Sequence, residues 1–537
     1  MKSHFFIGSK ESMNKTVRNK KVIVLGEHPL LPSILQQYAA MEHEVCHLKN
    51  INDNFDINSY DELFILTNDH DSSSVEADNE VISLLNKCAS GYDKESHNGH
   101  KLLCHLLLQS NTSLRILQMT DFNEEIRQSI DVYPFTMEDL WSKSIIVDYE
   151  PITVQSEKHA HVVIFGMNDM AEMVAINVAH KAHYPNFVRN TSLRTRITIV
   201  DENVGAKYEE FILKYQHLFD NSYYRVITPS SKPMVHLLHK PIYESTRECF
   251  VDVEWEFVDA SVYNQVVQQK LAYWATDNNQ LLSIVISNCD ESLNIDYALH
   301  LPEQVYSNHT PIYIYLRDAV LLESTSRIEK FATIKPFGMF NCGYDVRLPL
   351  ITMAKTINHI YDQFYNDNHE HMADDDWQMQ YAVDIDIEAR DKSWAKLSNV
   401  KRQSNILNAL SIPSKMKSIG LDEDDWDKFH DISQQDIELL AQVEHNRWNV
   451  EELILGFRPC TDEEQEIIEN DISMKEVMKR QSKVHYDIRA YNDLRPDATG
   501  KSVTIYDICL CTSLPLIAKS WVDEHKSCQP NEKGATT

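Results

Sequence analysis

The chain of 537 residues is too long for one hydrophobic core and suits about three domains of ordinary size. Hydrophobic residues make up 43%, which is enough for packed interiors, whereas the formal charge of −30 opposes binding to nucleic acids and to anionic membranes. The scattered cysteines predict neither a disulfide framework nor a zinc site. The sequence shows no long apolar run and no signal peptide, so we expect a soluble, cytoplasmic protein.

The first predicted domain, at 20–150, alternates apolar runs with helical stretches. Its expected elements are strands at 21–25, 43–48, 63–67 and 102–108, and a helix at 75–90. Such alternation is typical of a doubly wound α/β sheet. Gly26-Glu27-His28-Pro29 stands where a phosphate loop would lie, but Pro29 removes a backbone donor, so we expect no nucleotide there.

The second predicted domain, at 158–350, restarts the same pattern. Strands are expected at 161–165, 196–200, 253–258, 281–287 and 311–316, and a helix at 169–182. The two domains also end alike, since Val-Tyr-Pro-Phe-Thr at 132–136 corresponds to Ile-Lys-Pro-Phe-Gly at 334–338. The sequence therefore indicates a divergent internal duplication, with two Rossmann-like doubly wound halves.

The better nucleotide motif is Gly166-x-Asn168-x-x-Ala171, which follows a predicted strand and opens a helix, as a dinucleotide fingerprint does. Ala171 permits close packing of helix on strand, but Asn168 replaces a glycine that lets the backbone approach a pyrophosphate. Asp201 ends the next strand, where a carboxylate would accept hydrogen bonds from an adenosine ribose; the alternative is a strand-end turn residue. The expected cofactor is NAD or another adenine nucleotide.

Ser287-Asn288-Cys289-Asp290 follows another strand of the second half, at the edge where open α/β sheets bind their ligands. Asn288 is therefore a further candidate for cofactor binding. Cys289 is a conceivable nucleophile, but no histidine can be assigned to it from the sequence. A plain loop is the favoured interpretation.

Residues 351–389 are expected to form a helix and an acidic linker. His-Glu-His at 369–371 and Asp-Asp-Asp at 374–376 have a composition that can hold a divalent cation, although runs of charge mostly stay hydrated. His236 and His239 have a helical i, i+3 spacing, but a zinc site needs further ligands. We therefore predict no metal site.

Both halves, over residues 20 to 350, resemble the TrkA-N or RCK N-terminal Rossmann domain through this pattern and the partial motif at Gly166. The resemblance implies nucleotide binding and regulation of potassium transport. It also implies that the Rossmann domains pair face to face, as in a homodimer, and that any membrane transporter is a separate partner chain.

The most distinctive stretch is a predicted helix at 434–455. Ser433, with Asp436 three residues later, forms a start that resembles a capping box. Gly456 stands where a C-terminal cap is expected.

Inside this helix, Glu444-His445-Asn446-Arg447-Trp448 presents a mixed polar and aromatic face to its surroundings. The face is either a packing network or the wall of a small-ligand site that also includes His445. In the ligand interpretation, Glu444 and Trp448 bind a base by hydrogen bonding and stacking, and Arg447 counters a phosphate.

The string resembles the bacterial RyR domain, named for the tandem repeats of ryanodine receptors, and we place that domain at 390–522. Further matching elements follow in the family's order: Trp394-x-x-Leu397, Ser404-Asn405, Ile412-Pro413, Gly456-Phe457-Arg458, Tyr491-Asn492-Asp493-Leu494 and Leu514-Pro515. Phe457 departs from the pattern, because the family usually has Trp there. The resemblance implies a mainly α-helical domain and no established reaction.

Together these features predict a cytoplasmic ligand-sensing or regulatory protein that binds a nucleotide-like small molecule. The sequence has no Walker A loop, no Gly-x-Ser-x-Gly elbow and no His-Glu-x-x-His motif, so a non-enzyme is favoured. One alternative is an NAD(P)-dependent oxidoreductase, for which no acid or base over the nicotinamide can be named. The other is a structural partner chain without a ligand.

Overall fold

The computed structural model describes residues 19–50, 54–66, 74–97, 99–229, 235–243, 249–318, 320, 328–341, 344–366, 385–422, 425–426, 432–496 and 502–526. The chain divides into two compact units, residues 1–106 with 124–133 and residues 107–123 with 134–537, which we describe one at a time. The candidate cation ligands at 369–371 and 374–376 lie outside the described residues.

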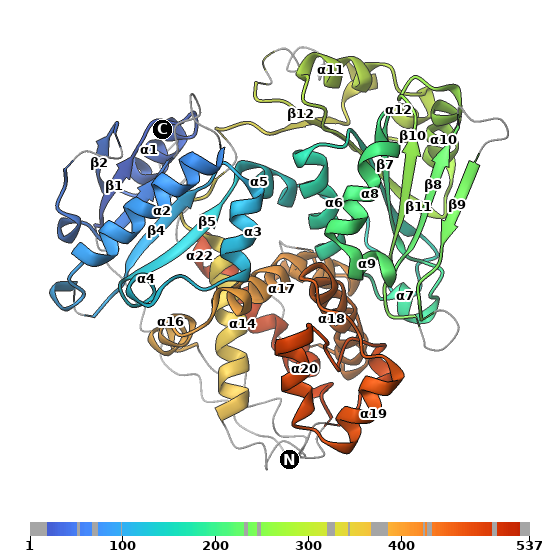
Figure 1. The fold of residues 1–537 in the computed structure, drawn as a ribbon. Helices are drawn as coiled ribbons and strands as arrows, with labels where there is room; N and C mark the ends of the chain where they lie inside the picture. The colour runs from blue at the N-terminus through green and yellow to red at the C-terminus, as the bar shows by residue number, and fades with distance from the viewer. Residues whose placement is uncertain are drawn as a thin grey trace, which may run out of the picture. The chain divides into compact units, whose positions relative to one another are not determined.

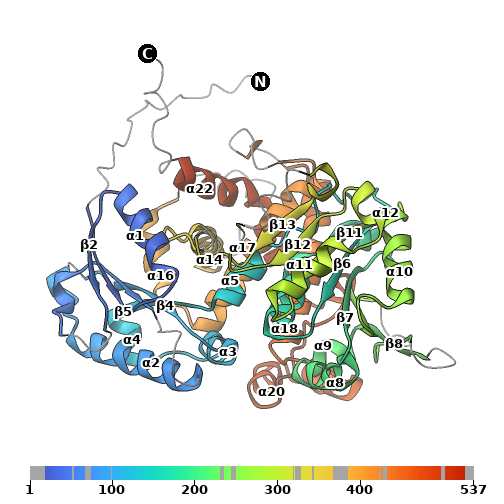
Figure 2. The same cartoon turned by 90° about the horizontal axis from the view of Figure 1, so that it is seen from above.

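The first half forms a five-stranded sheet in the order β2-β1-β3-β4-β5. Its strands are β1 (Lys21–Leu25), β2 (Glu44–Leu48), β3 (Glu62–Ile65), β4 (Leu102–Leu107) and β5 (Ile130–Phe135). Helices α1 (Leu31–Ala40) and α2 (Ser74–Gly91) lie on opposite faces of this sheet (Figure 2). The chain leaves β1 in one direction and β3 in the other, and right-handed crossovers then place the two helices on opposite faces.

The second half forms an eight-stranded sheet in the order β13-β12-β11-β6-β7-β10-β8-β9 (Figure 1). Its strands are β6 (His159–Phe165), β7 (Thr195–Asp201), β8 (Tyr223–Thr228), β9 (Val235–His239), β10 (Val253–Asp259), β11 (Gln280–Ile286), β12 (Ile312–Tyr315) and β13 (Ile334–Phe337). The series β10-β7-β6-β11-β12-β13 has the 3-2-1-4-5-6 order of dinucleotide-binding sheets. The predicted α/β class is confirmed.

The outer hairpin of the second sheet corrects one expectation. His236 and His239 lie on β9, which pairs antiparallel with β8, so the helical spacing inferred for these histidines is wrong. Side chains three residues apart on a strand point to opposite faces of the sheet. The His239 ring instead stacks on Tyr224 of β8, with ring centroids 4.4 Å apart.

Helices cover the second sheet on both sides. They are α6 (Asp169–Lys181), α8 (Val204–Lys214), α9 (Gln216–Asp220), α10 (Gln265–Thr276), α11 (Glu291–Leu299) and α12 (Glu303–Ser307). One core cluster joins strand residues such as Val163 and Ile284 to Leu271 of α10 and Val305 of α12, all of them fully buried. Strands buried on both faces explain the continuous apolar runs in the sequence.

The two halves share a detailed plan. Gly26 N donates to Leu48 O at 2.9 Å, and Gly166 N donates to Val200 O at 3.0 Å. Both glycines have positive φ, 96° and 105°. After the fourth strand of the first half, Leu108 N bonds Phe135 O, and at the matching place Leu316 N bonds Phe337 O, each at 2.9 Å. If β10, β8 and β9 are left out, the strand orders agree, as the proposed duplication requires.

The rest of the second unit is helical. It contains α14 (Pro349–Asn366), α16 (Ile387–Trp394), α17 (Asn399–Ser418), α18 (Gln434–Ile454), α19 (Asp462–Asn470), α20 (Met474–Ser482), α21 (Ile505–Thr512) and α22 (Leu514–Lys526). Helices α17 and α18 contact each other and α6 of the second half (Figure 1). The predicted boundary at 390 stays a prediction, because residues 158–350 and 390–522 belong to the same compact unit.

Within the described residues, no single helix is long and apolar enough to cross a membrane. Helices α21 and α22 reach that length and composition only as a pair, which is bent by 43°.

Candidate functional site

The first candidate site lies at the carboxyl edge of the second sheet, which we define as the C-terminal ends of β6, β7, β10 and β11. Strand order reverses between β6 and β11, and open α/β sheets bind ligands at such a switch point. Gly166 follows β6 with φ +105°, and a Cβ there would lie 3.1 Å from Asn288 Oδ1 and 3.3 Å from Ser287 O. Both the backbone conformation and the close approach of the loop after β11 therefore require glycine.

Asn168 caps helix α6 and bridges to the neighbouring strand. Its Oδ1 accepts a hydrogen bond from Ala171 N at 3.0 Å, and its Nδ2 donates to Ser287 O at 2.5 Å. Ala171 is fully buried, in line with its expected packing role. The Asn168 side chain thus occupies the place where a glycine would leave room for a pyrophosphate.

Asp201 ends β7 and is tied to the loop after β6. Its Oδ2 accepts a hydrogen bond from Met167 N at 2.9 Å, and its Oδ1 accepts one from Asn203 N at 2.7 Å. Lys207 Nζ lies 3.8 Å from Asp201 and donates to Met167 O at 2.9 Å. An ionised carboxylate has about four acceptor positions, so Asp201 retains capacity for further donors.

Asn288 and Cys289 also lie at this carboxyl edge. Asn288 N donates to Asn294 Oδ1 at 2.8 Å, which holds the loop against α11. The exposed Cys289 thiol contacts Asn168 Nδ2 at 3.5 Å, and no imidazole or carboxylate contacts it among the described residues. The structure therefore brings Gly166, Asn168 and Asp201 together with Asn288, and it gives Cys289 no base.

Charge at the carboxyl edge favours some ligands over others. Asp169 is exposed in the first turn of α6, Asp201 lies beside it, and Glu202 is exposed in the next loop. A pyrophosphate would meet these carboxylates, whereas hydroxyl and amino donors would be attracted. The edge is chemically better suited to a ribose than to a diphosphate.

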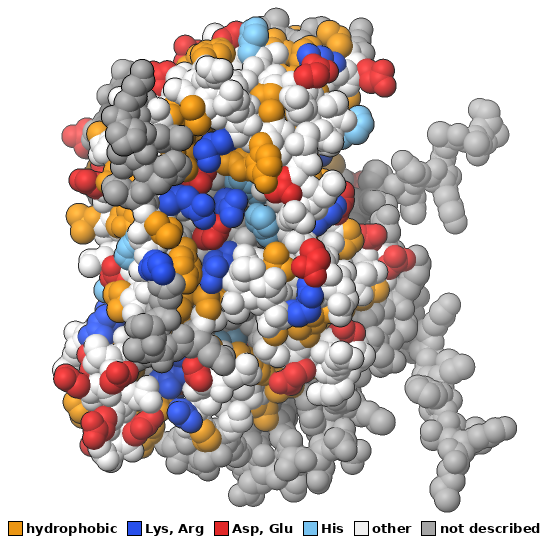
Figure 3. Space-filling model, turned by 90° about the vertical axis from the view of Figure 1, so that its right-hand side faces the viewer, with side chains coloured by type: hydrophobic (Ala, Val, Ile, Leu, Met, Phe, Trp, Pro, Cys, Tyr) orange, Lys and Arg blue, Asp and Glu red, His pale blue; other side chains and the backbone are white. Residues whose placement is uncertain are grey.

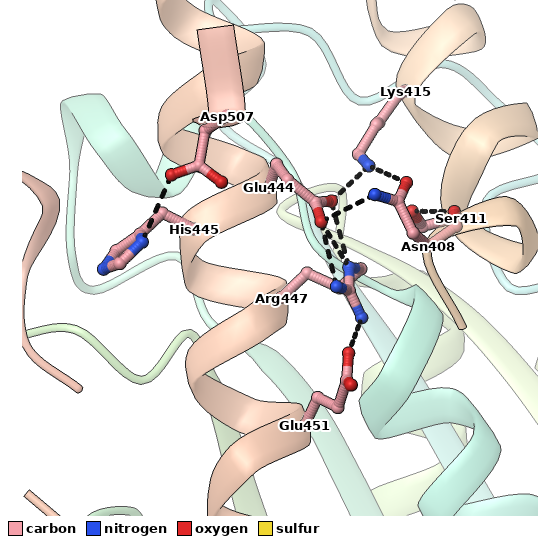
Figure 4. A network of polar contacts seen from close by, with 8 residues as sticks. All are labelled: Asn408, Ser411, Lys415, Glu444, His445, Arg447, Glu451 and Asp507. Carbon is pink, nitrogen blue, oxygen red and sulfur yellow. Dashed lines mark hydrogen bonds and ion pairs between the residues drawn. The ribbon is translucent and has the colours of Figure 1, made fainter. Parts of the chain in front are cut away.

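The second candidate site lies along α18. Arg447 binds the Glu444 carboxylate through Nε and Nη2, each at 2.9 Å, and Asn408 Nδ2 donates to the same carboxylate at 2.9 Å (Figure 4). Lys415 of α17 forms an ion pair with Glu444. The remaining face of the guanidinium donates to Glu451 Oε2 at 2.6 Å.

This network is internal. The exposed fraction is 2% for Glu444 and 1% for Arg447. Burial raises the pKa of Glu444, but the charges and hydrogen bonds of Arg447 and Lys415 outweigh it and lower that pKa to about 2. Because these groups satisfy one another away from solvent, the geometry favours the packing interpretation for Glu444 and Arg447.

His445 and Trp448 face another direction. His445 Nε2 lies 3.1 Å from Arg489 O, and Nδ1 lies 3.3 Å from Asp507 Oδ2, so both ring nitrogens have partners. Trp448 is half-buried, with its ring centroid 5.5 Å from His445 and 4.8 Å from His485. Of the four predicted residues of the string, only Trp448 is partly exposed.

Glu452 was missed as a candidate in the sequence, although it lies on the same helical stripe as Trp448. It is 8% exposed, and its Oε2 atom has no hydrogen-bond partner among the described residues. Burial, and next the charge of Glu451, raise the pKa of Glu452 to about 7. Its spacing of four residues from Trp448 is the only sequence signal that pointed to it.

The described residues contain no group of three or more His, Cys, Asp or Glu side chains placed to hold a metal ion. Comparison with known proteins gave no matching family model and no matching curated protein. Among solved structures, the chain is similar to one of the chains of dipicolinate synthase from Bacillus halodurans, with 9% sequence identity over 59% of this chain and 88% of that chain. The TM-score of 0.19 is too low to support an argument about function.

Proposed function

We propose that the protein is a ligand-sensing regulator whose second sheet binds an adenosine-containing small molecule at Gly166 and Asp201. One observation carries this proposal. At the switch point of a 3-2-1-4-5-6 sheet, the Gly166 turn and the Asp201 carboxylate are joined through Met167 N. This pairs a loop that only glycine can form with an acid that can accept ribose hydroxyls.

The ligand is defined by what the carboxyl edge can accept. Asp201 offers acceptor positions to a ribose, while Asn168 and Asp169 oppose a pyrophosphate. Adenosine or a mononucleotide should therefore bind about as well as NAD, because the phosphates add little. The oxidoreductase alternative lacks support, since the Cys289 thiol contacts only Asn168 among the described residues. A role in potassium transport, through pairing with a second copy and a separate transporter chain, rests on the RCK resemblance alone.

Calorimetric titration of adenosine, ADP-ribose, NAD and ATP into the full chain tests the proposal. Asp201→Ala should weaken binding of the best ligand by about 1.5–3 kcal/mol, the usual contribution of a hydrogen bond to a charged group. Asp259→Ala is the matched control, because Asp259 ends β10 directly beside Asp201 in the sheet. Equal affinity in wild type and Asp201→Ala, or no binding of any of the four compounds, contradicts the proposal.

A further inference from the structure

A buried carboxyl group without a partner lies on α18, away from the carboxyl edge. The Oε2 atom of Glu452 is buried and accepts no hydrogen bond from a described residue. Glu444, two turns earlier on the same helix, is held by Arg447, Lys415 and Asn408. Native proteins rarely leave a buried carboxyl unpaired, and such groups concentrate where a ligand completes the site.

An aromatic surface adjoins Glu452. Trp448 precedes it by one helical turn, so the indole and the carboxyl lie on one stripe of α18. The indole is half-buried, and the His485 ring meets it edge-on with centroids 4.8 Å apart. Phe457 follows at the end of the helix, 6.1 Å from the same imidazole. A partly exposed indole beside a carboxyl suits a flat ring that carries N–H donors.

Two lysines complete the set. Lys479 Nζ lies 2.8 Å from His485 Nε2, and Lys483 Nζ lies 4.5 Å from the centre of the Phe457 ring. Both act electrostatically on Glu452, yet neither forms an ion pair within the described part of the chain. Lys475 on the same helix is by contrast bound to Asp487 at 2.7 Å. Two amines without an acidic partner are exceptional in a chain of charge −30 and suit a phosphate.

We propose that Trp448, Glu452, Lys479 and Lys483 form a binding site for a purine nucleotide. The base stacks on the Trp448 indole, its N–H groups donate to the Glu452 carboxyl, and Lys479 and Lys483 bind the phosphates. A simple amine is disfavoured, because the two lysines would repel it. This site is separate from the carboxyl edge and does not depend on the function proposed there.

The test is calorimetric titration of GTP, ATP and inorganic triphosphate into the full chain at neutral pH. We expect saturable binding of at least one nucleotide and weaker binding of triphosphate. The double variant Lys479→Ala with Lys483→Ala should lose about tenfold or more in affinity. Arg480→Ala is the matched control, because its side chain is 81% exposed on the same helix, and it should bind within about twofold of wild type.

Glu452→Gln separates the site from a purely structural role. It should weaken nucleotide binding about tenfold while leaving the melting temperature of the unliganded protein unchanged or higher, because it removes an unpaired buried acid. Asp201→Ala should retain this binding. The proposal is overturned if no nucleotide binds, if Glu452→Gln and the double lysine variant bind like wild type, if triphosphate binds as tightly as the nucleotides, or if Asp201→Ala abolishes the binding.

Discussion

Two glutamates on α18 show how far neighbours decide the chemistry of a residue. Glu444 and Glu452 are both buried, but the pKa of Glu444 is lowered to about 2 and that of Glu452 is raised to about 7. The difference comes from Lys415 and Asn408, which reach Glu444 from α17. The sequence left the role of the Glu444 string open, because partners 29 and 36 residues earlier are not visible in a local pattern.

Glu452 should make stability depend on pH. An unfolded chain releases this proton near pH 4.5, whereas the folded protein holds it to about pH 7. The contribution of this group to stability is therefore fully present below pH 4.5 and is lost as pH rises through 7, by roughly 3 kcal/mol. Urea unfolding at pH 5 and pH 8 should show this loss in wild type and a smaller loss in Glu452→Gln. Equal losses in the two proteins would exclude it.

Arg447 should be essential to packing. Arg447→Ala leaves Glu451 without its cation and Glu444 with Lys415 alone, so we expect a cost of about 3–5 kcal/mol in the free energy of unfolding. Arg480→Ala, which removes an exposed guanidinium, should cost less than about 1 kcal/mol. Chemical denaturation of both variants measures the difference. Similar costs would mean that the network does not hold the helices together.

At the scale of elements, local signals predicted α18 well. The helix spans Gln434–Ile454 against an expected 434–455, because Ser433 caps it and Gly456 follows with φ +85°. The parallel strands were also predictable, since burial on both faces leaves continuous apolar runs. The β8 and β9 hairpin was not, because β9 exists through its pairing with β8 and its own residues do not specify a strand.

The cap of α6 gives a prediction at this scale. Asn168→Gly restores the glycine of the dinucleotide fingerprint and removes the side chain that fills the loop. Gly is a tolerable N-cap, so stability should fall only modestly, by about 1 kcal/mol. Affinity for NAD should rise relative to that for adenosine. Calorimetry and thermal melting of wild type and variant provide the measurement, and an unchanged affinity ratio would show that Asn168 does not exclude the pyrophosphate.

At the scale of the whole molecule, charge and topology each carry information that no motif does. Basic and acidic side chains lie close together on the side that Figure 3 shows, so the formal charge of −30 does not exclude local basic groups. The repeated hydrogen bonds of Gly26 and Gly166 link two sheets whose sequences differ widely. The extra strands of the second sheet, β10, β8 and β9, could not be assigned a place from the sequence, because strand order depends on tertiary pairing.

The contact of α17 and α18 with α6 makes a final prediction about the second unit. Burial and the charge of Arg447 on α18 lower the pKa of His180 on α6 to about 3, so these helices meet in an interior free of water. Limited proteolysis should cut first in the acidic stretch 366–376, whose composition is that of a linker. The fragments on either side should nevertheless co-elute in gel filtration at neutral pH, because separation would expose Arg447 and His180 unpaired. Separate elution would show that residues 390–522 are an independent domain, and early cleavage within 434–455 would show that α18 is not part of a packed core.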